Sequence, residues 1–165
     1  MSQNYRSPKP YPIPQGLGRN IRYARILQSV YSAGVSELTA IHQYVYHQMI
    51  TRQEFPALSH ALSEIAKVEM HHLNMLGSCI LQLGLHPTFG YYQGTRKARW
   101  NSGFVRYARN PKGIVELSLE GEQQAIDGYN RALGAISNEQ IMALLSRIIE
   151  DEQVHIEVLL QLSQA

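Results

Sequence analysis

The sequence is poor in cysteine and in charged residues. Its 165 residues include one cysteine, Cys79, which excludes within this chain a disulfide framework, a four-cysteine iron–sulfur or rubredoxin site, and a zinc knuckle. Any metal that the chain binds by itself must therefore use oxygen and nitrogen ligands. Charged residues make up 17%, against roughly 25% in an average soluble protein. We expect part of the surface to be covered by another copy, in a homodimer or a larger homo-oligomer.

Long apolar runs are missing too. No stretch approaches about 18 consecutive apolar residues, and residues 1–18 are polar and rich in proline, unlike a signal peptide. We therefore expect a cytoplasmic protein with no membrane segment. The length suits a single domain. Residues 1–18 are predicted to form an extended strap or a disordered tail, and residues 19–165 the folded domain.

The two parts of the chain carry opposite charge. Residues 1–112 hold 13 Lys and Arg against 4 Asp and Glu, whereas residues 113–165 hold 2 against 9. Because the total is only +2, we interpret this as a basic part that packs against an acidic part, within or between subunits. A nucleic-acid surface is the less favoured alternative.

Four long segments have the apolar period of a helix, and none alternates with period two, so the fold class is all-α. The helices are predicted over residues 20–50, 51–83, 110–136 and from 137 onward, with capping-box patterns at Thr51–Glu54 and Ser137–Gln140. Short connections pair the first two and the last two as hairpins, while residues 85–110 form a long crossover. The sequence thus predicts an antiparallel four-helix bundle.

One hairpin pattern occurs twice. Residues 37–44 (ELTAIHQY) and 122–129 (EQQAIDGY) share the pattern E-x-x-A-I-x-x-Y. E-x-x-H follows in each hairpin, at Glu69–His72 and Glu152–His155, 32 and 30 residues after the first glutamate. The chain is therefore two copies of one hairpin, each with a Glu on its first helix and Glu-x-x-His on its second.

The repeated acids lie on apolar helix faces. Residues three apart share a helix face, so each Glu-x-x-His can direct a carboxylate and an imidazole at one point. A buried carboxylate is normally paired or bound to metal, and few basic side chains share these faces. Four carboxylates and two imidazoles suit two divalent cations, and the predicted metal ligands are Glu37, Glu69, His72, Glu122, Glu152 and His155.

In these motifs, residues 21–163 resemble the ferritin-like di-metal carboxylate superfamily, nearest to its rubrerythrin-like and manganese-catalase-like branches. The resemblance implies that Glu37 and Glu122 are terminal ligands and that Glu69 and Glu152 bridge the two ions. It implies that His72 and His155 complete one ion each. Tyr44 and Tyr129 follow their own glutamates by two turns and are interpreted as hydrogen-bond donors that orient those carboxylates, with electron donation as a further role. Iron or manganese is the expected metal, and zinc is also accepted.

Departures from the relatives narrow the expected function. Rubrerythrins carry an extra glutamate on the third helix and usually a rubredoxin module, which this chain lacks, so a peroxidase would need an external electron donor. Storage ferritins add a short fifth helix that helps to build their cage, but only ten residues follow His155. A cage-forming storage protein is therefore disfavoured. We expect an oxidoreductase that acts on hydrogen peroxide or dioxygen, with peroxidase, catalase-like or ferroxidase activity. The alternatives are a non-catalytic metal-binding or assembly protein and a mini-ferritin-like DNA-protecting protein.

Other polar residues are predicted to lie outside the centre. Glu120 competes with Glu122 for the third-helix position, but it shares a polar face, so Glu122 is favoured. Cys79 is expected in the core. The surface or packing histidines are predicted to be His42, His47, His60, His71 and His86, and the solvent-facing acids Glu64, Glu150, Asp151 and Glu157.

Overall fold

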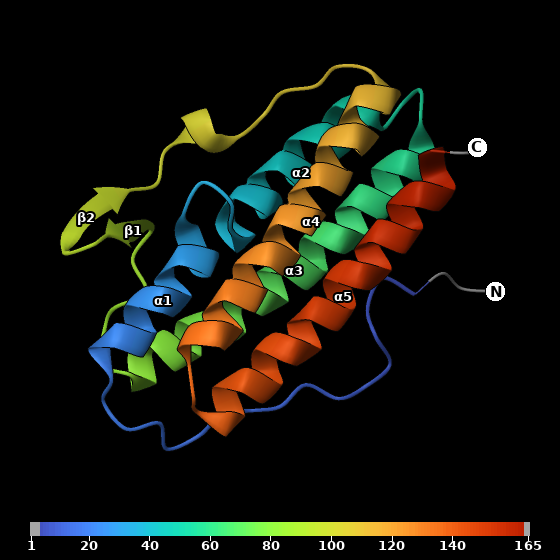
Figure 1. Ribbon diagram of the computed structural model, residues 1–165. Coiled ribbons are helices and arrows are strands. Elements are labelled where there is room, and N and C mark those ends of the chain that lie inside the picture. The colour runs from blue at the N-terminus through green and yellow to red at the C-terminus, as the bar shows by residue number, and fades with distance from the viewer. Residues whose placement is uncertain (1–3, 164–165) are drawn as a thin grey trace.

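The computed structural model describes residues 4–163, and its main body is a bundle of helices (Figure 1). The helices are α1 (Ile21–Ser32), α2 (Glu37–Thr51), α3 (Pro56–Gln82), α4 (Pro111–Ala135) and α5 (Glu139–Ser163). Two hairpins, α2 with α3 and α4 with α5, pack together, and α1 extends the first of them against α3 and α4. The predicted antiparallel four-helix bundle is confirmed.

The first predicted helix is broken. A single helix over residues 20–50 is wrong, because α1 ends at Ser32 and α2 begins at Glu37. The Ser36 hydroxyl caps α2 by accepting a hydrogen bond from the Thr39 N–H at 3.3 Å. The apolar stripe continues on both sides, so periodicity alone did not reveal the break. As a result, Glu37 occupies the first turn of α2, where the helix dipole favours a carboxylate.

Both predicted capping boxes are wrong. Thr51 is the last residue of α2, and its hydroxyl donates to the His47 carbonyl at 2.8 Å, while α3 starts at Pro56. At the start of α5 the cap is Asn138, whose side chain accepts from the Ile141 N–H at 3.0 Å. Asn is as good an N-cap as Ser, and it stands next to the predicted Ser137.

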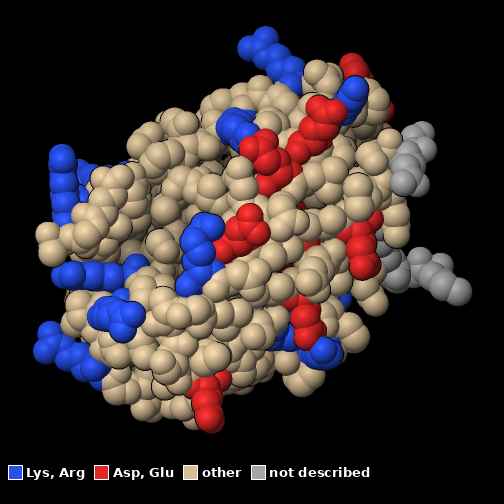
Figure 2. Space-filling view, viewed as in Figure 1, with Lys and Arg blue, Asp and Glu red and all other residues tan. Residues whose placement is uncertain are grey.

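The crossover contains a small sheet. Residues 84–110 lead from α3 to α4 and include an antiparallel pair, β1 (Gly90–Gln93) with β2 (Arg96–Arg99), and a 3₁₀ turn η1 (Ser102–Phe104). The Gly90 carbonyl accepts hydrogen bonds from Gln28 and Ser32 of α1. Four-residue strands are too short to show period two in a sequence. Figure 2 shows that Lys and Arg gather at this end of the molecule, whereas Asp and Glu lie mostly over α4 and α5.

The N-terminal segment lies against the bundle. Residues 4–20 form no helix or strand and run along α5 before α1 begins (Figure 1). Ser7, Pro14 and Leu17 are buried there; the first three residues of the predicted strap lie outside the described range. We call residues 4–18 the strap below. Among residues 4–163, no helix combines the length and apolar character needed to cross a membrane.

The hydrophobic core is divided in two. One cluster surrounds Leu27, Leu76 and Leu144, and the other surrounds Leu62 and Leu159. Between them, along α3, lie Glu69 and His72, both buried. The bundle therefore holds a layer of ionisable side chains between two apolar layers.

Candidate metal centre

The six predicted ligands meet in this buried layer. Their ligand atoms form two groups, each within 4.8 Å, and Glu69 and Glu152 belong to both groups. Glu37 and His72 complete one group, and the other is completed by Glu122 and His155. All six side chains are at most 3% exposed. The arrangement offers two adjacent cation positions that share two carboxylates.

Each imidazole presents its Nδ1 atom to the acids. His72 Nδ1 lies 3.0 Å from a Glu69 oxygen and 3.3 Å from a Glu152 oxygen. His155 Nδ1 lies 3.0 Å from Glu69 and 3.2 Å from Glu152. The contacts of His72 with Glu69 and of His155 with Glu152 follow from the spacing of three residues, which stacks the two side chains of each motif on one helix face. The other two contacts join α3 to α5.

The residues fit a pair of divalent ions. Glu69 Oε1 and Glu152 Oε1 are buried and make no well-aligned hydrogen bond. Their partners are ionic, His155 Nδ1 at 3.0 Å from Glu69 Oε1 and His72 Nδ1 at 3.3 Å from Glu152 Oε1. A cation between the two groups would satisfy both oxygens. Carboxylate and imidazole ligands suit iron and manganese and also accept zinc, so the cluster is compatible with a metal pair of any of these.

In the absence of metal, protons balance the acids. Burial and the neighbouring carboxylates raise the pKa of Glu37 and Glu122 well above the usual range. Burial also opposes the charged form of Glu69, but the adjacent His155 and His72 outweigh it and lower its pKa. The pKa of both imidazoles is raised, because their acidic neighbours overcome burial. Metal binding must therefore displace protons from this cluster.

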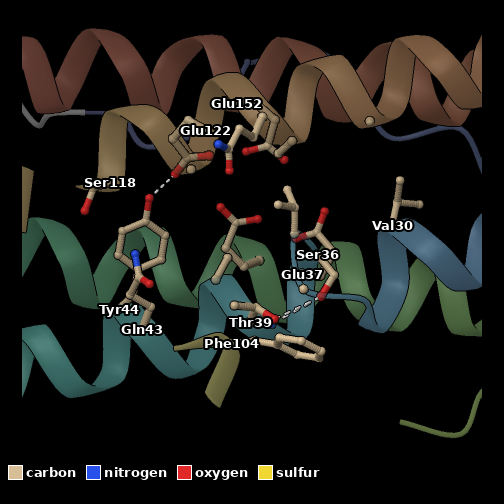
Figure 3. Close-up of a pocket in the computed structure, with 18 of the residues that line it drawn as sticks. Val30, Ser36, Glu37, Thr39, Gln43, Tyr44, Phe104, Ser118, Glu122 and Glu152 are labelled. Atoms are coloured by element: carbon tan, nitrogen blue, oxygen red, sulfur yellow. Dashed lines mark hydrogen bonds between the residues drawn. The ribbon is translucent and has the colours of Figure 1, made fainter. Parts of the chain in front are cut away.

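The two tyrosines connect the hairpins. Tyr44 donates a hydrogen bond to Glu122 (Figure 3), and Tyr129 donates one to Glu37. The expectation that each tyrosine reaches the glutamate of its own helix is wrong. Seven residues rise about 10 Å along a helix, too far for that contact, whereas α2 and α4 lie antiparallel and place each tyrosine opposite the other helix's glutamate.

Sequence reasoning missed Asp151. It was predicted to face solvent, but it is fully buried, and its Oδ2 lies 2.9 Å from His72 Nε2. Oδ1 accepts from the Ser7 N–H at 2.7 Å and from Arg147 at 2.5 Å. The hydrogen bonds from His72, Tyr11 and Arg147 hold the pKa of Asp151 at about 2 against the effect of burial. The strap covers this face of α5, which no periodicity in α5 could indicate. An acid directly before Glu-x-x-His was the available signal.

The strap itself contacts the other predicted ligand histidine. His155 Nε2 lies 3.0 Å from the carbonyl oxygen of Tyr5. In the first hairpin, Val68 precedes Glu-x-x-His where Asp151 does so in the second, so no matching acid exists for His155. Because a carbonyl can only accept, Nε2 of His155 carries a proton, so Nδ1 is the atom that must give up its proton for a metal.

The remaining candidates lie elsewhere. Glu120 is exposed and pairs with Arg106 at 2.8 Å. His47 is fully buried, without a hydrogen-bond partner for its ring, and burial lowers its pKa to about 4. Cys79 is buried. Among the described residues, no metal-ligand group includes any of the five other histidines, which are His42, His47, His60, His71 and His86.

Known proteins share this architecture. A manganese catalase from Anabaena superposes with a TM-score of 0.80 at 20% identity, over 93% of this chain and 77% of its own. The bacterioferritin of Desulfovibrio desulfuricans, whose structure was described for its diiron site, superposes with a TM-score of 0.72 at 25% identity, over 87% and 79%. In sequence, that organism's bacterioferritin is 29% identical over 142 residues, which cover 84% of this chain and 74% of the relative. The family model for the ferritin-like domain matches residues 35–164, and the chain therefore belongs to the ferritin-like domain family.

Proposed function

We propose that this protein binds two iron or manganese ions and uses them for two-electron redox chemistry on hydrogen peroxide or dioxygen. The observation that carries the proposal is the pair of buried ligand groups joined by Glu69 and Glu152. One ion would be held by Glu37 and His72, and the other by Glu122 and His155, with the two shared carboxylates between them. Diiron and manganese relatives of the same fold support this assignment.

Charge balance favours two ions. Four carboxylates carry −4 when ionised, and two divalent cations carry +4, so the filled site is neutral in an apolar layer. A bound metal pair supplies electrons and open coordination positions for a small oxidant. The chain's own contribution is to keep the carboxylates oriented through Tyr44 and Tyr129 and to exclude bulk water with the two apolar clusters.

The oxidant enters from the side of α2 and α4. A cavity lined by Glu37, Glu122 and the two shared glutamates lies there, whereas Asp151 and the strap cover the opposite, histidine side. Reduction or dismutation of peroxide is the first choice, and dioxygen-driven oxidation of ferrous iron as substrate is the second. If the protein reduces peroxide as a peroxidase, it needs an external electron donor.

The test is elemental analysis of protein purified without added metal, followed by assays of peroxide consumption and of ferrous oxidation under air. We expect about two iron or manganese ions per chain and turnover in one of these assays. Glu152→Gln should lose both ions and all turnover, while Glu120→Gln, on the exposed face of α4, should behave as wild type. Two bound ions without turnover would support the non-catalytic metal-binding alternative, and an absence of bound metal after metal addition would refute the proposal.

A further inference from the structure

A cavity of about 280 Å³ opens onto the carboxylate cluster. Figure 3 shows Glu122 and Glu152 reaching towards it from α4 and α5, and Glu37 from α2. The segment between α1 and α2 and the Phe104 ring of the crossover complete its wall. The carboxylates of Glu37, Glu69, Glu122 and Glu152 form its polar floor.

The cavity exists because the facing helices carry small residues. Its lining includes Ala40 of α2 and Gly121, Ala125 and Gly128 of α4. A Cβ atom added at Gly121 would meet no atom within 4 Å. The break before α2 adds Gly34, which lies against Phe104, with 3.4 Å between a Cβ built at Gly34 and the ring. Larger side chains at these positions would fill the space.

The volume exceeds what the proposed oxidants need. A water molecule occupies about 30 Å³ of liquid, and an apolar cavity of about 150 Å³ holds a benzene ring. If two ions and two water molecules took about 100 Å³ of the floor, the remainder would still admit one aromatic ring. Peroxide and dioxygen are close to water in size, so they leave most of the cavity unused.

We propose that this cavity binds a single-ring phenolic molecule, with its ring between α2 and α4 and its hydroxyl towards the glutamates. The walls offer aliphatic and aromatic contacts at Val30, Val35 and Phe104, which suit the ring. The floor offers the carboxylates of four glutamates, whose oxygens can accept a hydrogen bond from a hydroxyl group in the metal-free protein. In the metal-loaded protein, the same orientation would direct the phenol oxygen towards the ions, and this part of the inference rests on the proposed function. Binding of the ring to the metal-free cavity does not.

The experiment measures binding of 4-fluorophenol by ¹⁹F NMR to the full-length protein, both metal-free and loaded with diamagnetic zinc. Gly121→Leu fills the cavity from α4, and we expect it to weaken binding at least about tenfold, equivalent to about 1.4 kcal/mol. Gly134→Leu is the matched control, because a Cβ at Gly134 also meets no atom within 4 Å and Gly134 lies outside the cavity. Ala125→Val is a milder filling variant if Gly121→Leu does not fold.

The outcomes separate this inference from the proposed function. The cavity inference is supported if Gly121→Leu loses 4-fluorophenol binding but keeps its metal content and melting temperature, while Gly134→Leu still binds 4-fluorophenol. Equal binding by wild type and both glycine variants, or no binding in either metal state, would overturn it and leave the metal assignment intact. Fluorobenzene binding as tightly as 4-fluorophenol would overturn the role given to the hydroxyl. Failure of zinc to bind would count against the proposed function, while the metal-free titration would still decide the cavity.

Discussion

Glu37→Gln should remove one ion and leave the metal-free protein almost unchanged. Glu37 belongs to only one ligand group, and burial raises its pKa well above normal, which favours the neutral form of its side chain in the metal-free protein. Glutamine is then a near-isosteric replacement that can still accept the hydrogen bond from Tyr129. In the metal-loaded protein, however, the change removes an anionic ligand from one of two ions.

The magnitude follows from metal linkage. At a free metal concentration of about 100 times Kd, one bound ion stabilises the fold by about 2.7 kcal/mol. For a chain of this length, 1 kcal/mol shifts the melting temperature by about 2–4 °C. If the variant loses that ion, its loaded form should melt about 5–10 °C below loaded wild type, whereas the metal-free forms should agree within about 2 °C.

Calorimetry with and without metal, together with metal content, checks this expectation. Glu120→Gln is the matched control, because Glu120 is exposed on the same bundle and pairs with Arg106 and Gln124, neither of which is a predicted ligand. Two ions in Glu37→Gln with an unchanged metal-induced shift would show that Glu37 is not a ligand. Loss of both ions would show that the two cation positions cannot be filled independently.

Further expectations concern the shared acid, the strap and pH. Glu152→Gln should abolish the metal-induced rise in melting temperature, because both cation positions use Glu152; a residual shift above about half of the wild-type value would contradict this. Tyr11→Phe removes the phenol that donates to Asp151 at 2.5 Å and should cost about 1–3 kcal/mol in urea unfolding, since Asp151 is buried. The metal-free protein should lose stability as pH rises above about 6.5. The pKa of His72 and His155 is raised in the folded state, which therefore holds protons that the unfolded state releases. A melting temperature that stays constant or increases between pH 6.5 and 8.5 would refute this.

The bundle and the buried cluster of six acidic and histidine side chains could be predicted because both are recorded in local patterns. Helical periodicity placed four amphipathic segments, and the hairpin repeat placed Glu37 and Glu122 one helix away from each Glu-x-x-His. Burial of Glu69 followed from its apolar stripe alone. The position of His72 followed from a spacing of three residues. No knowledge of what packs outside the helices was needed for these steps.

Tertiary structure decided what periodicity does not encode. Asp151 is buried because the strap, more than 130 residues earlier in the chain, lies over α5; from α5 alone its position resembles a solvent face. Tyr44 donates to Glu122 because two antiparallel helices meet, a register set by packing between hairpins. The sequence by itself thus determined which acids lie on the apolar helix faces, since a helix face is defined by residues a few positions apart. Only the folded chain decided which groups cover and connect those acids, since such contacts join residues that are distant in sequence.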